Sequence, residues 1–241
     1  MTIPNRSART LPADLARLDR ETSRLLATVE ALTPEQLAGP SRCEGWSRAH
    51  VVAHLAGNAD ALGNLIGWAV TGVEQAMYVS VQARNDAIDA GARLDAGELK
   101  ALLGDAVRRF RDGAARLTGP LKAPEVALRD WPLNAYALLV PRITEVIVHH
   151  GDLDAGWTLA DAGPDALDDA IAMALYRLDA AGESSAPGAG LRLSTGDGAA
   201  WRTGDGTTSV HGPRHCLVAW LARGEPEGLT FSGARPELPS W

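Results

Sequence analysis

The sequence has few cysteines and no long apolar run, and both absences restrict what the protein can be. Its two cysteines, Cys43 and Cys216, lie far apart and outside any Cys-x-x-Cys arrangement. A disulfide framework and a cysteine-based zinc site are therefore not indicated, and a reducing compartment suits the chain. No stretch approaches the roughly 18 apolar residues that span a bilayer, and the N-terminus lacks the apolar segment of a signal peptide. We expect a cytoplasmic protein with no membrane partner.

Basic residues are also in the minority. The chain has 30 acidic against 23 basic residues, a formal net charge of -7, and no block of basic residues. This charge argues against nucleic acid or an anionic membrane as a partner. The length of 241 residues and the apolar share of 46% are ordinary for one large globular domain or two smaller ones. We expect a monomer or a small homo-oligomer with small-molecule partners.

Apolar residues recur at helical spacing through most of the N-terminal three quarters of the chain. Ser47 is the expected N-cap of one helix, and Asp95 with Glu98 forms an acidic capping box for another. The helix around Glu145 begins either near Asn134, with a kink at Pro141, or with Pro141 in its first turn. A short helical turn is expected at 33–36. The long helices are expected at 12–32, 48–71, 94–117, through 143–157, and at 165–181.

The stretch GESSAPGAG at 182–190 is rich in Gly, Ser and Pro and indicates a domain boundary. Short strand patterns separated by Gly and Asp turns follow it, together with one helix. We therefore predict a mainly α protein, with a four-helix bundle at 1–184 and a small α+β C-terminal domain at 185–241. Its strands are expected at 191–196, 199–204, 207–212 and 228–233, and its helix at 213–224.

An unusual set of polar residues lies in the apolar stretch ITEVIVHHGDLDAGW, residues 143–157. On a helix, Glu145, His149 and Asp152 stand at i, i+4 and i+7 and project from nearly the same face. His150 points about 100° away. A carboxylate and an imidazole on a core-facing helix are costly to desolvate without a partner, and a metal ion is a strong one. A salt-bridged Glu and a hydrogen-bonded His are the ordinary alternative.

A third candidate ligand comes from the helix that follows Ser47. His50 and His54 lie one turn apart on that helix, which would lie beside the helix of Glu145 in a bundle. His54, Glu145 and His149 would form a two-His, one-carboxylate site, which for zinc leaves one coordination position open. His50 is then a fourth ligand, a residue supporting the ligands, or an exposed residue of the first helical turn.

Several motifs in order along the chain resemble the mycothiol-dependent maleylpyruvate isomerase family. They are EGWSRAHVVAHLAGNADAL, MYVSVQARNDAI, TEVIVHHGDLDAGW and the ending GLTFSGARPELPSW. The resemblance covers nearly the whole chain. It implies a DinB-like metal-binding bundle as the N-terminal domain, a divalent metal for which zinc is favoured, and mycothiol as the thiol.

The resemblance also assigns roles to residues. It implies that His54, Glu145 and His149 bind the metal and that Arg84 is an active-site residue. A surface ion pair of Arg84 with Asp86 or Asp89 is the alternative.

Residues near the metal and in the C-terminal domain are expected to form a polar binding surface for mycothiol. Tyr78, Gln82, Asn85 and Arg214 are the candidates for binding the thiol cofactor, with Trp220 either beside them or in the core. One position departs from the family, because isomerase relatives often have Arg directly before the ligand Glu, where this chain has Thr144. Because a cation is missing at this position, we doubt that the substrate is the doubly anionic one of the isomerase.

The predicted function is a metal-assisted, mycothiol-dependent maleylpyruvate isomerase-type enzyme. A cis alkene becomes trans only if its double bond is lost temporarily, and addition of a thiolate achieves this. One alternative is a mycothiol S-transferase, which conjugates the thiol to an electrophile or an activated sugar. A second alternative, of another class, is a protein that binds a metal or ligand without catalysis.

Overall fold

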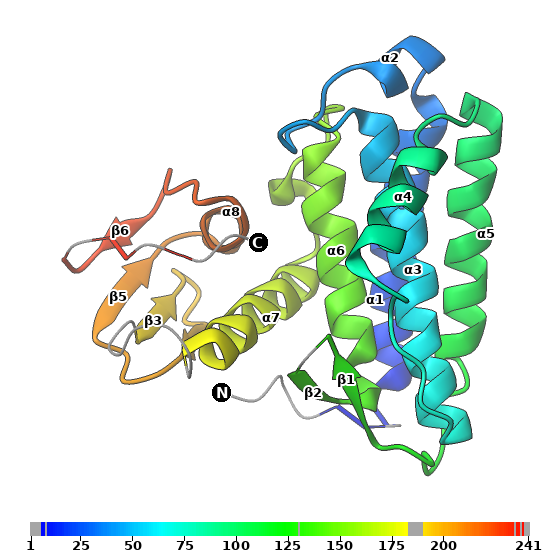
Figure 1. Cartoon of the computed structure of the whole chain (residues 1–241). Coiled ribbons are helices and arrows are strands. Elements are labelled where there is room, and N and C mark those ends of the chain that lie inside the picture. The colour runs from blue at the N-terminus through cyan, green and yellow to red at the C-terminus, as the bar shows by residue number, and fades with distance from the viewer. Residues whose placement is uncertain are drawn as a thin grey trace. The chain divides into compact units, whose positions relative to one another are not determined.

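The structure is a computed structural model of the chain (Figure 1). It divides into two compact units, Arg6–Thr158 and a C-terminal unit that begins at Leu159. The predicted metal ligands all belong to the first unit. The residues that the structure describes are 6–7, 9–129, 131–182, 190–233, 235–236 and 238.

Four long helices form the framework of the first unit. They are α1 (Leu11–Ala31), α3 (Arg48–Thr71), α5 (Ala96–Ala114) and α6 (Leu139–Asp152). Helix α3 packs against α5 and α6, and α1 packs against the same two helices, so the four close into a bundle (Figure 1). The predicted four-helix bundle is confirmed.

The ends of these helices follow the local sequence. The Ser47 side chain accepts a hydrogen bond from the backbone N–H of His50, and the His50 side chain accepts one from the backbone N–H of Ser47. Gly72 ends α3 in the left-handed conformation that glycine adopts without strain. Asp95 and Glu98 form the same reciprocal cap on α5. Each cap satisfies backbone groups that would otherwise lack partners, which fixes where the helix starts.

Shorter elements join the bundle helices, and two of them were not predicted: α4 and the antiparallel hairpin β1–β2. The 3-10 helix η1 ends where α6 begins, which places Pro141 in the first turn of α6. Helical structure thus starts after Asn134, as the first expectation had it, and Pro141 lies in the first turn of the α-helix, as the second had it. The bounds are α2 Pro34–Ala38, α4 Val81–Gly91, β1 Glu125–Leu128, β2 Trp131–Asn134 and η1 Ala135–Leu138.

Helix α4 lies against α3, and a glycine permits the close approach. A Cβ atom added at Gly91 would lie 2.8 Å from the Cβ of Ala53, closer than two methyl groups can pack. Ala53 immediately precedes His54 on α3, and Arg84 lies on α4. The Gly91–Ala53 contact therefore sets how near Arg84 comes to His54.

In the described part of the C-terminal unit, two α-helices and the short 3-10 helix η2 combine with one mixed sheet. The strand order is β4-β3-β5-β6, with β3 and β5 parallel and the other pairs antiparallel. Helix α7 packs against α8. This arrangement confirms the predicted small α+β part. The elements are η2 (Leu159–Asp161), α7 (Pro164–Gly182), β3 (Leu191–Ser194), β4 (Ala200–Arg202), β5 (Thr208–His211), α8 (Arg214–Arg223) and β6 (Thr230–Phe231).

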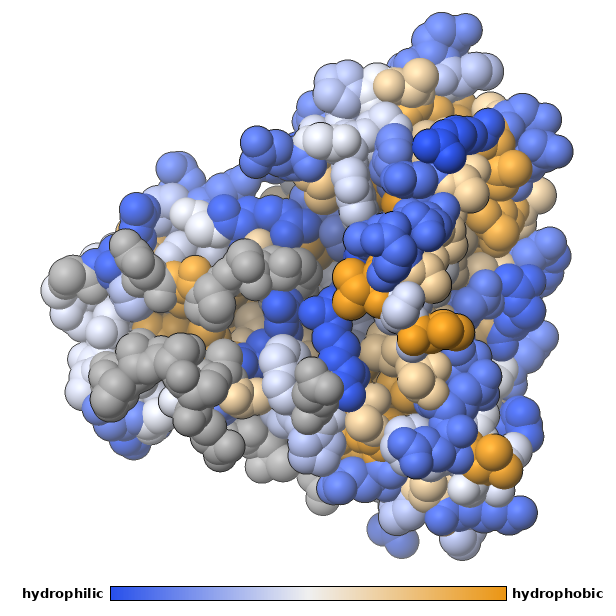
Figure 2. Space-filling model, in the orientation of Figure 1, coloured by the Kyte–Doolittle hydropathy of each residue, from blue (hydrophilic) through white to orange (hydrophobic). Residues whose placement is uncertain are grey.

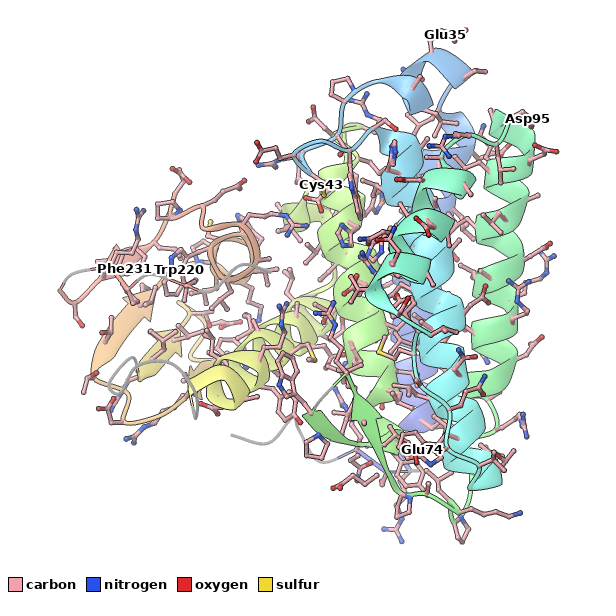
Figure 3. All side chains as sticks on the ribbon, in the orientation of Figure 1. Glu35, Cys43, Glu74, Asp95, Trp220 and Phe231 are labelled. Carbon is pink, nitrogen blue, oxygen red and sulfur yellow. The ribbon has the colours of Figure 1, made fainter. Side chains whose placement is uncertain are left out.

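Trp220 belongs to the core of this unit. The residue is 1% exposed, and its ring meets the Phe231 ring edge to face with the centroids 5.2 Å apart (Figure 3). The compact units divide before η2, so α7 groups with the C-terminal elements. The domain boundary expected at residue 184 lies after α7, whereas the two compact units divide before it. That boundary stays a prediction.

Candidate metal centre

Helices α3 and α6 bring the three predicted ligands together. His54 Nε2 lies 3.0 Å from Glu145 Oε2, and His149 Nε2 lies 3.3 Å from the same oxygen. One ligand atom from each residue lies within 4.8 Å of the other two. The rings of His54 and His149 meet edge to face, 4.6 Å between centroids. The sequence spacing on α6 and the packing of α3 on α6 produce this convergence.

The arrangement of these atoms fits a divalent cation. Two nitrogen or oxygen ligands held at about 2.0–2.2 Å in a tetrahedral arrangement lie roughly 3.3–3.6 Å apart. The distances at Glu145 Oε2 are close to this range. His54 and His149 are buried, whereas the side chain of Glu145 is 22% exposed, which leaves the group open on one side. The donor set is typical of zinc sites that keep one position for a non-protein ligand. That a metal binds here stays a prediction.

Protonation of the triad reflects its close packing. Burial would raise the pKa of Glu145, but hydrogen bonds from His149 and His54 outweigh burial and hold this pKa well below 4.5. Burial would also lower the pKa of His149, yet its hydrogen bonds to Asp152, Cys43 and Glu145 raise it well above 6.5. For His54, burial dominates and lowers the pKa. Without metal, the site therefore holds a carboxylate, an imidazolium and a neutral imidazole.

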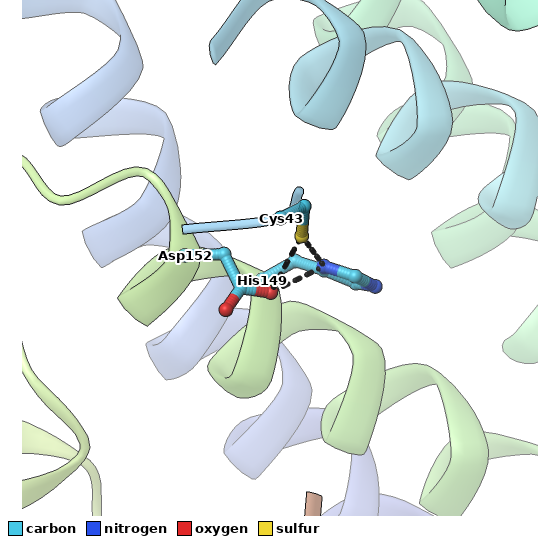
Figure 4. Close-up of side chains that lie close together, drawn as sticks. All are labelled: Cys43, His149 and Asp152. Atoms are coloured by element: carbon cyan, nitrogen blue, oxygen red, sulfur yellow. Dashed lines mark hydrogen bonds and ion pairs between the residues drawn. The ribbon is translucent and has the colours of Figure 1, made fainter. Parts of the chain in front are cut away.

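The second nitrogen of His149 faces Asp152 and Cys43 (Figure 4). His149 Nδ1 lies 2.7 Å from Asp152 Oδ2 and 3.9 Å from Cys43 Sγ, and the thiol donates to Asp152 Oδ2 at 3.3 Å. A carboxylate that accepts the Nδ1 proton directs Nε2 of the same ring toward Glu145. These three residues also have a spacing that could hold a cation, but they share His149 with the first group. The contact of Cys43 with α6 was not predicted.

Arg84 reaches the triad from α4. Its Nη2 atom lies 3.2 Å from His54 Nδ1, and its Nη1 atom donates to Asn85 Oδ1 at 2.9 Å. The guanidinium lies 6.0 Å from the ring centroid of Trp46 and 5.9 Å from that of Tyr78, within the range of cation–π contacts. The arginine is therefore directed to the ligands, and not to the surface pairing considered from sequence.

Asp86 and Asp89, the surface partners considered for Arg84, contact other residues. Asp86 accepts a hydrogen bond from Gln82 at 2.7 Å, and Asp89 lies 3.8 Å from His50. Trp46 was not predicted as part of the site, although it stands beside the Ser47 cap. Its ring is tilted over the His54 ring, 5.5 Å between centroids.

The residues expected to bind the thiol cofactor differ in position. Tyr78 is half-buried next to Arg84, and burial, followed by the charge of Glu145, raises its pKa and keeps the hydroxyl protonated. Gln82 and Asn85 are exposed on α4. Arg214 belongs to the C-terminal unit, where it pairs with Asp168 at 2.6 Å and with Asp197 at 2.5 Å. Their role in binding the cofactor stays a prediction.

The remaining histidines of this region have structural partners. His50 Nδ1 lies 2.7 Å from Ser47 Oγ as part of the helix cap, so His50 is not among the converging ligands. His150 Nε2 lies 2.7 Å from Thr28 Oγ1, and its ring stacks on Trp157 with the centroids 4.0 Å apart. His150 points away from the triad, as the helical spacing predicts.

A buried arginine, also missed from sequence, links the two ligand helices. Arg142 precedes Glu145 by one turn on α6, and its Nη1 atom donates to Leu55 O at 2.9 Å and to Asn58 Oδ1 at 2.8 Å on α3. Burial lowers its pKa to about 10, so the guanidinium stays charged at neutral pH. Among the described residues, its Nη2 atom has no hydrogen-bond partner. Arg142 holds α3 and α6 together directly beside the ligands.

None of the helices in the described part of the chain has the length and apolar character that a membrane span requires.

Residues 18–154 match the family model described as the mycothiol maleylpyruvate isomerase N-terminal domain. The comparison with curated proteins gives no match.

Two solved structures are similar over almost the whole chain. One is a crystal structure of the mycothiol-dependent maleylpyruvate isomerase, and the other is a histidine-to-alanine mutant of that enzyme. Each is 30% identical and superposes with a TM-score of 0.82, covering 98% of this chain and 99% of the other. The resemblance inferred from sequence is confirmed: the chain belongs to the mycothiol-dependent maleylpyruvate isomerase family.

Proposed function

We propose that the protein is a mycothiol-dependent, metal-assisted enzyme that isomerises an activated cis alkene to the trans form. The observation that carries the proposal is the convergence of His54, Glu145 and His149 with the Arg84 guanidinium beside them. Family membership adds the isomerase activity and the thiol, since the similar solved structures are of a mycothiol-dependent isomerase. A divalent cation held by the three ligands supplies the positive charge that favours the deprotonated thiol near neutral pH.

The residues of the chain fit the steps of such an isomerisation. Addition of the thiolate sulfur to the alkene forms a C–S bond and moves the π electron pair to the conjugated carbonyl oxygen as an enolate. Arg84 donates to this oxygen with its planar fork of N–H groups, which stabilises the developing charge. The former double bond rotates, the enolate collapses, and the C–S bond breaks to release the thiolate and the trans alkene.

The contact between Arg84 and His54 supports this role for the arginine. With His54 Nε2 engaged as a ligand, the proton of the neutral imidazole lies on Nδ1. Two donors then face each other across the 3.2 Å between Nδ1 and Arg84 Nη2, so that contact is no longer a hydrogen bond. The guanidinium is thereby free to bind the carbonyl or carboxylate oxygen of a substrate.

The experiment follows the thiol and the alkene together. Zinc-loaded protein is incubated with mycothiol and a panel of activated cis alkenes, maleylpyruvate among them, and both reactants are quantified by mass spectrometry. We expect a trans product with the thiol regenerated. Consumption of one thiol per product would instead identify an S-transferase. No change in either reactant across the panel would contradict the proposal and favour a non-catalytic metal-binding protein.

A further inference from the structure

A cavity of about 510 Å³ lies beside Arg84, entirely within the first unit. It is lined by residues of α3, α4 and the segment 75–79, together with Leu102 of α5. His54 and Arg84 contribute to its wall, so the cavity borders the same groups that the proposed chemistry uses. A volume of this size accommodates a small organic molecule.

The wall of this cavity is mainly apolar and built from small residues on α3. Gly57 and Ala61 form part of that side, and an added Cβ at Gly57 would meet no atom within 4 Å. Met77, Ile88 and Leu102 contribute larger apolar side chains on the other sides. The missing side chain at Gly57 therefore leaves space that an apolar group of a ligand can fill.

The charges on the wall are few. Arg84 is the one Arg or Lys among the described residues lining the cavity, and no carboxylate pairs with it. Asp60 is the one acidic residue there, and Arg109 Nε and Nη2 neutralise it with contacts of 3.0 and 2.8 Å. Thr144 adds no charge to the site, since it is buried and donates to Val140 O. Arg84 is thus the one basic side chain among the described residues of this wall with which a ligand can pair.

Exposed apolar residues also occur where the chain enters α4. Val79 is 98% exposed and lines the cavity, and Val81 in the first turn of α4 is 75% exposed. Figure 2 shows hydrophobic side chains exposed on the face that carries α4 and the segment before it. Water-exposed valines at the edge of an apolar cavity favour a ligand whose body is itself apolar.

We infer that the electrophile is an unsaturated monoacid with an apolar body, which enters this cavity while its single carboxylate or carbonyl group pairs with Arg84. The inference rests on the proposed function and narrows its substrate class. A dianion of the same length would carry its second carboxylate along the apolar wall away from Arg84 and the metal ligands, where no second basic side chain of the described lining compensates the loss of water.

The test compares two saturated probes of equal length, octanoate and suberate, which carry one and two carboxylates. Binding to the zinc-loaded full chain is measured by isothermal titration calorimetry without thiol. We expect octanoate to bind at least about tenfold more tightly than suberate, because only suberate must bury a second charge. Equal affinities, tighter binding of suberate, or no binding of octanoate would each overturn the inference.

Two glycine variants locate the binding. Gly57→Leu fills the cavity from α3. Gly63→Leu adds the same side chain on the same helix, where an added Cβ likewise meets no atom within 4 Å, but Gly63 is not among the residues that line this cavity. We expect Gly57→Leu to weaken octanoate binding by about tenfold or more and Gly63→Leu to change it less than about twofold. Circular dichroism confirms that both variants fold. Unchanged octanoate affinity in folded Gly57→Leu would place the ligand elsewhere.

These binding results stand apart from the proposed activity. If mycothiol supports no turnover but octanoate binds as described, the cavity assignment holds and the proposed reaction fails. If isomerisation occurs but suberate binds as well as octanoate, the reaction holds and the substrate class is wrong.

Discussion

The imidazole of His149 is held by Asp152, whose Oδ2 atom lies 2.7 Å from Nδ1 on the side of the ring away from Glu145. Asp152 follows His149 by three residues on the same helix, so the orientation of the ligand is built into one turn of α6. This contact motivates the first prediction.

Replacing Asp152 by Asn should weaken zinc binding by about 10- to 100-fold, the usual effect of losing a carboxylate that orients a ligand imidazole. Competition with a chromophoric chelator measures the affinity. Asp154→Asn is the matched control, because Asp154 is exposed and is not among the converging ligands. Equal affinities for the two variants would mean that Asp152 does not orient the ligand.

Zinc affinity should rise with pH, and the pKa of His149 determines the pH range in which it rises. Its pKa is raised well above 6.5, so the metal-free protein keeps the imidazolium as the pH rises past 6.5. Zinc needs the neutral imidazole and must displace that proton, which costs less as the pH approaches the raised pKa. Calorimetry in buffers of different ionisation enthalpy should detect proton release on binding. Affinity that stays constant from pH 6 to about pH 8 would contradict the protonation of His149.

Arg84→Ala should keep the metal but lose about 10²- to 10³-fold in kcat, the usual scale for removing one donor to a developing oxyanion. Zinc content and steady-state turnover are measured on the same preparation. Arg111→Ala serves as the control, since Arg111 is a surface partner of Asp19 on the same unit. If Arg84→Ala turns over at the original rate, the arginine is structural and the enolate step is wrong.

Alanine should have opposite effects at two helical glycines. At Gly91 the new Cβ would lie 2.8 Å from Ala53 Cβ, so we expect α4 to shift and unfolding to require about 1–3 kcal/mol less. At Gly104 on α5 the nearest atom is the flexible end of Arg108 at 3.7 Å, and alanine should stabilise by roughly 0.5–1 kcal/mol. Urea unfolding compares them. A stabilised Gly91→Ala protein would refute the tight contact of α4 with α3.

Much of the bundle follows from local sequence. Ser47 with His50, and Asp95 with Glu98, start their helices through contacts within one turn, and such contacts can be read from the sequence. Helix α4 was missed because it is short and only Ile88 and Gly91 are buried in it. The β1–β2 hairpin was missed because its strands have four residues each and one contains a proline.

Some residues of the candidate site could likewise be predicted from local sequence, and others could not. Glu145 and His149 could be paired from their i, i+4 spacing, and His54 followed once the two helices were placed side by side. Cys43 and Trp46 lie in a loop before α3, and no periodic pattern predicts which helix a loop residue contacts. Arg142 was missed because a charged residue is expected at the surface, whereas here carbonyl and amide oxygens of α3 satisfy it in the core.

The most direct measurement of the central claim is the zinc content of three proteins purified and loaded identically: the unmodified chain, His50→Ala and His54→Ala. The two histidines lie one turn apart on α3, but only His54 is among the converging ligands. With native mass spectrometry we expect one zinc ion on the unmodified chain, one on His50→Ala, and none on His54→Ala, because two protein ligands would remain. Retention of zinc by a folded His54→Ala protein, or its loss from a folded His50→Ala protein, would contradict the site built from His54, Glu145 and His149.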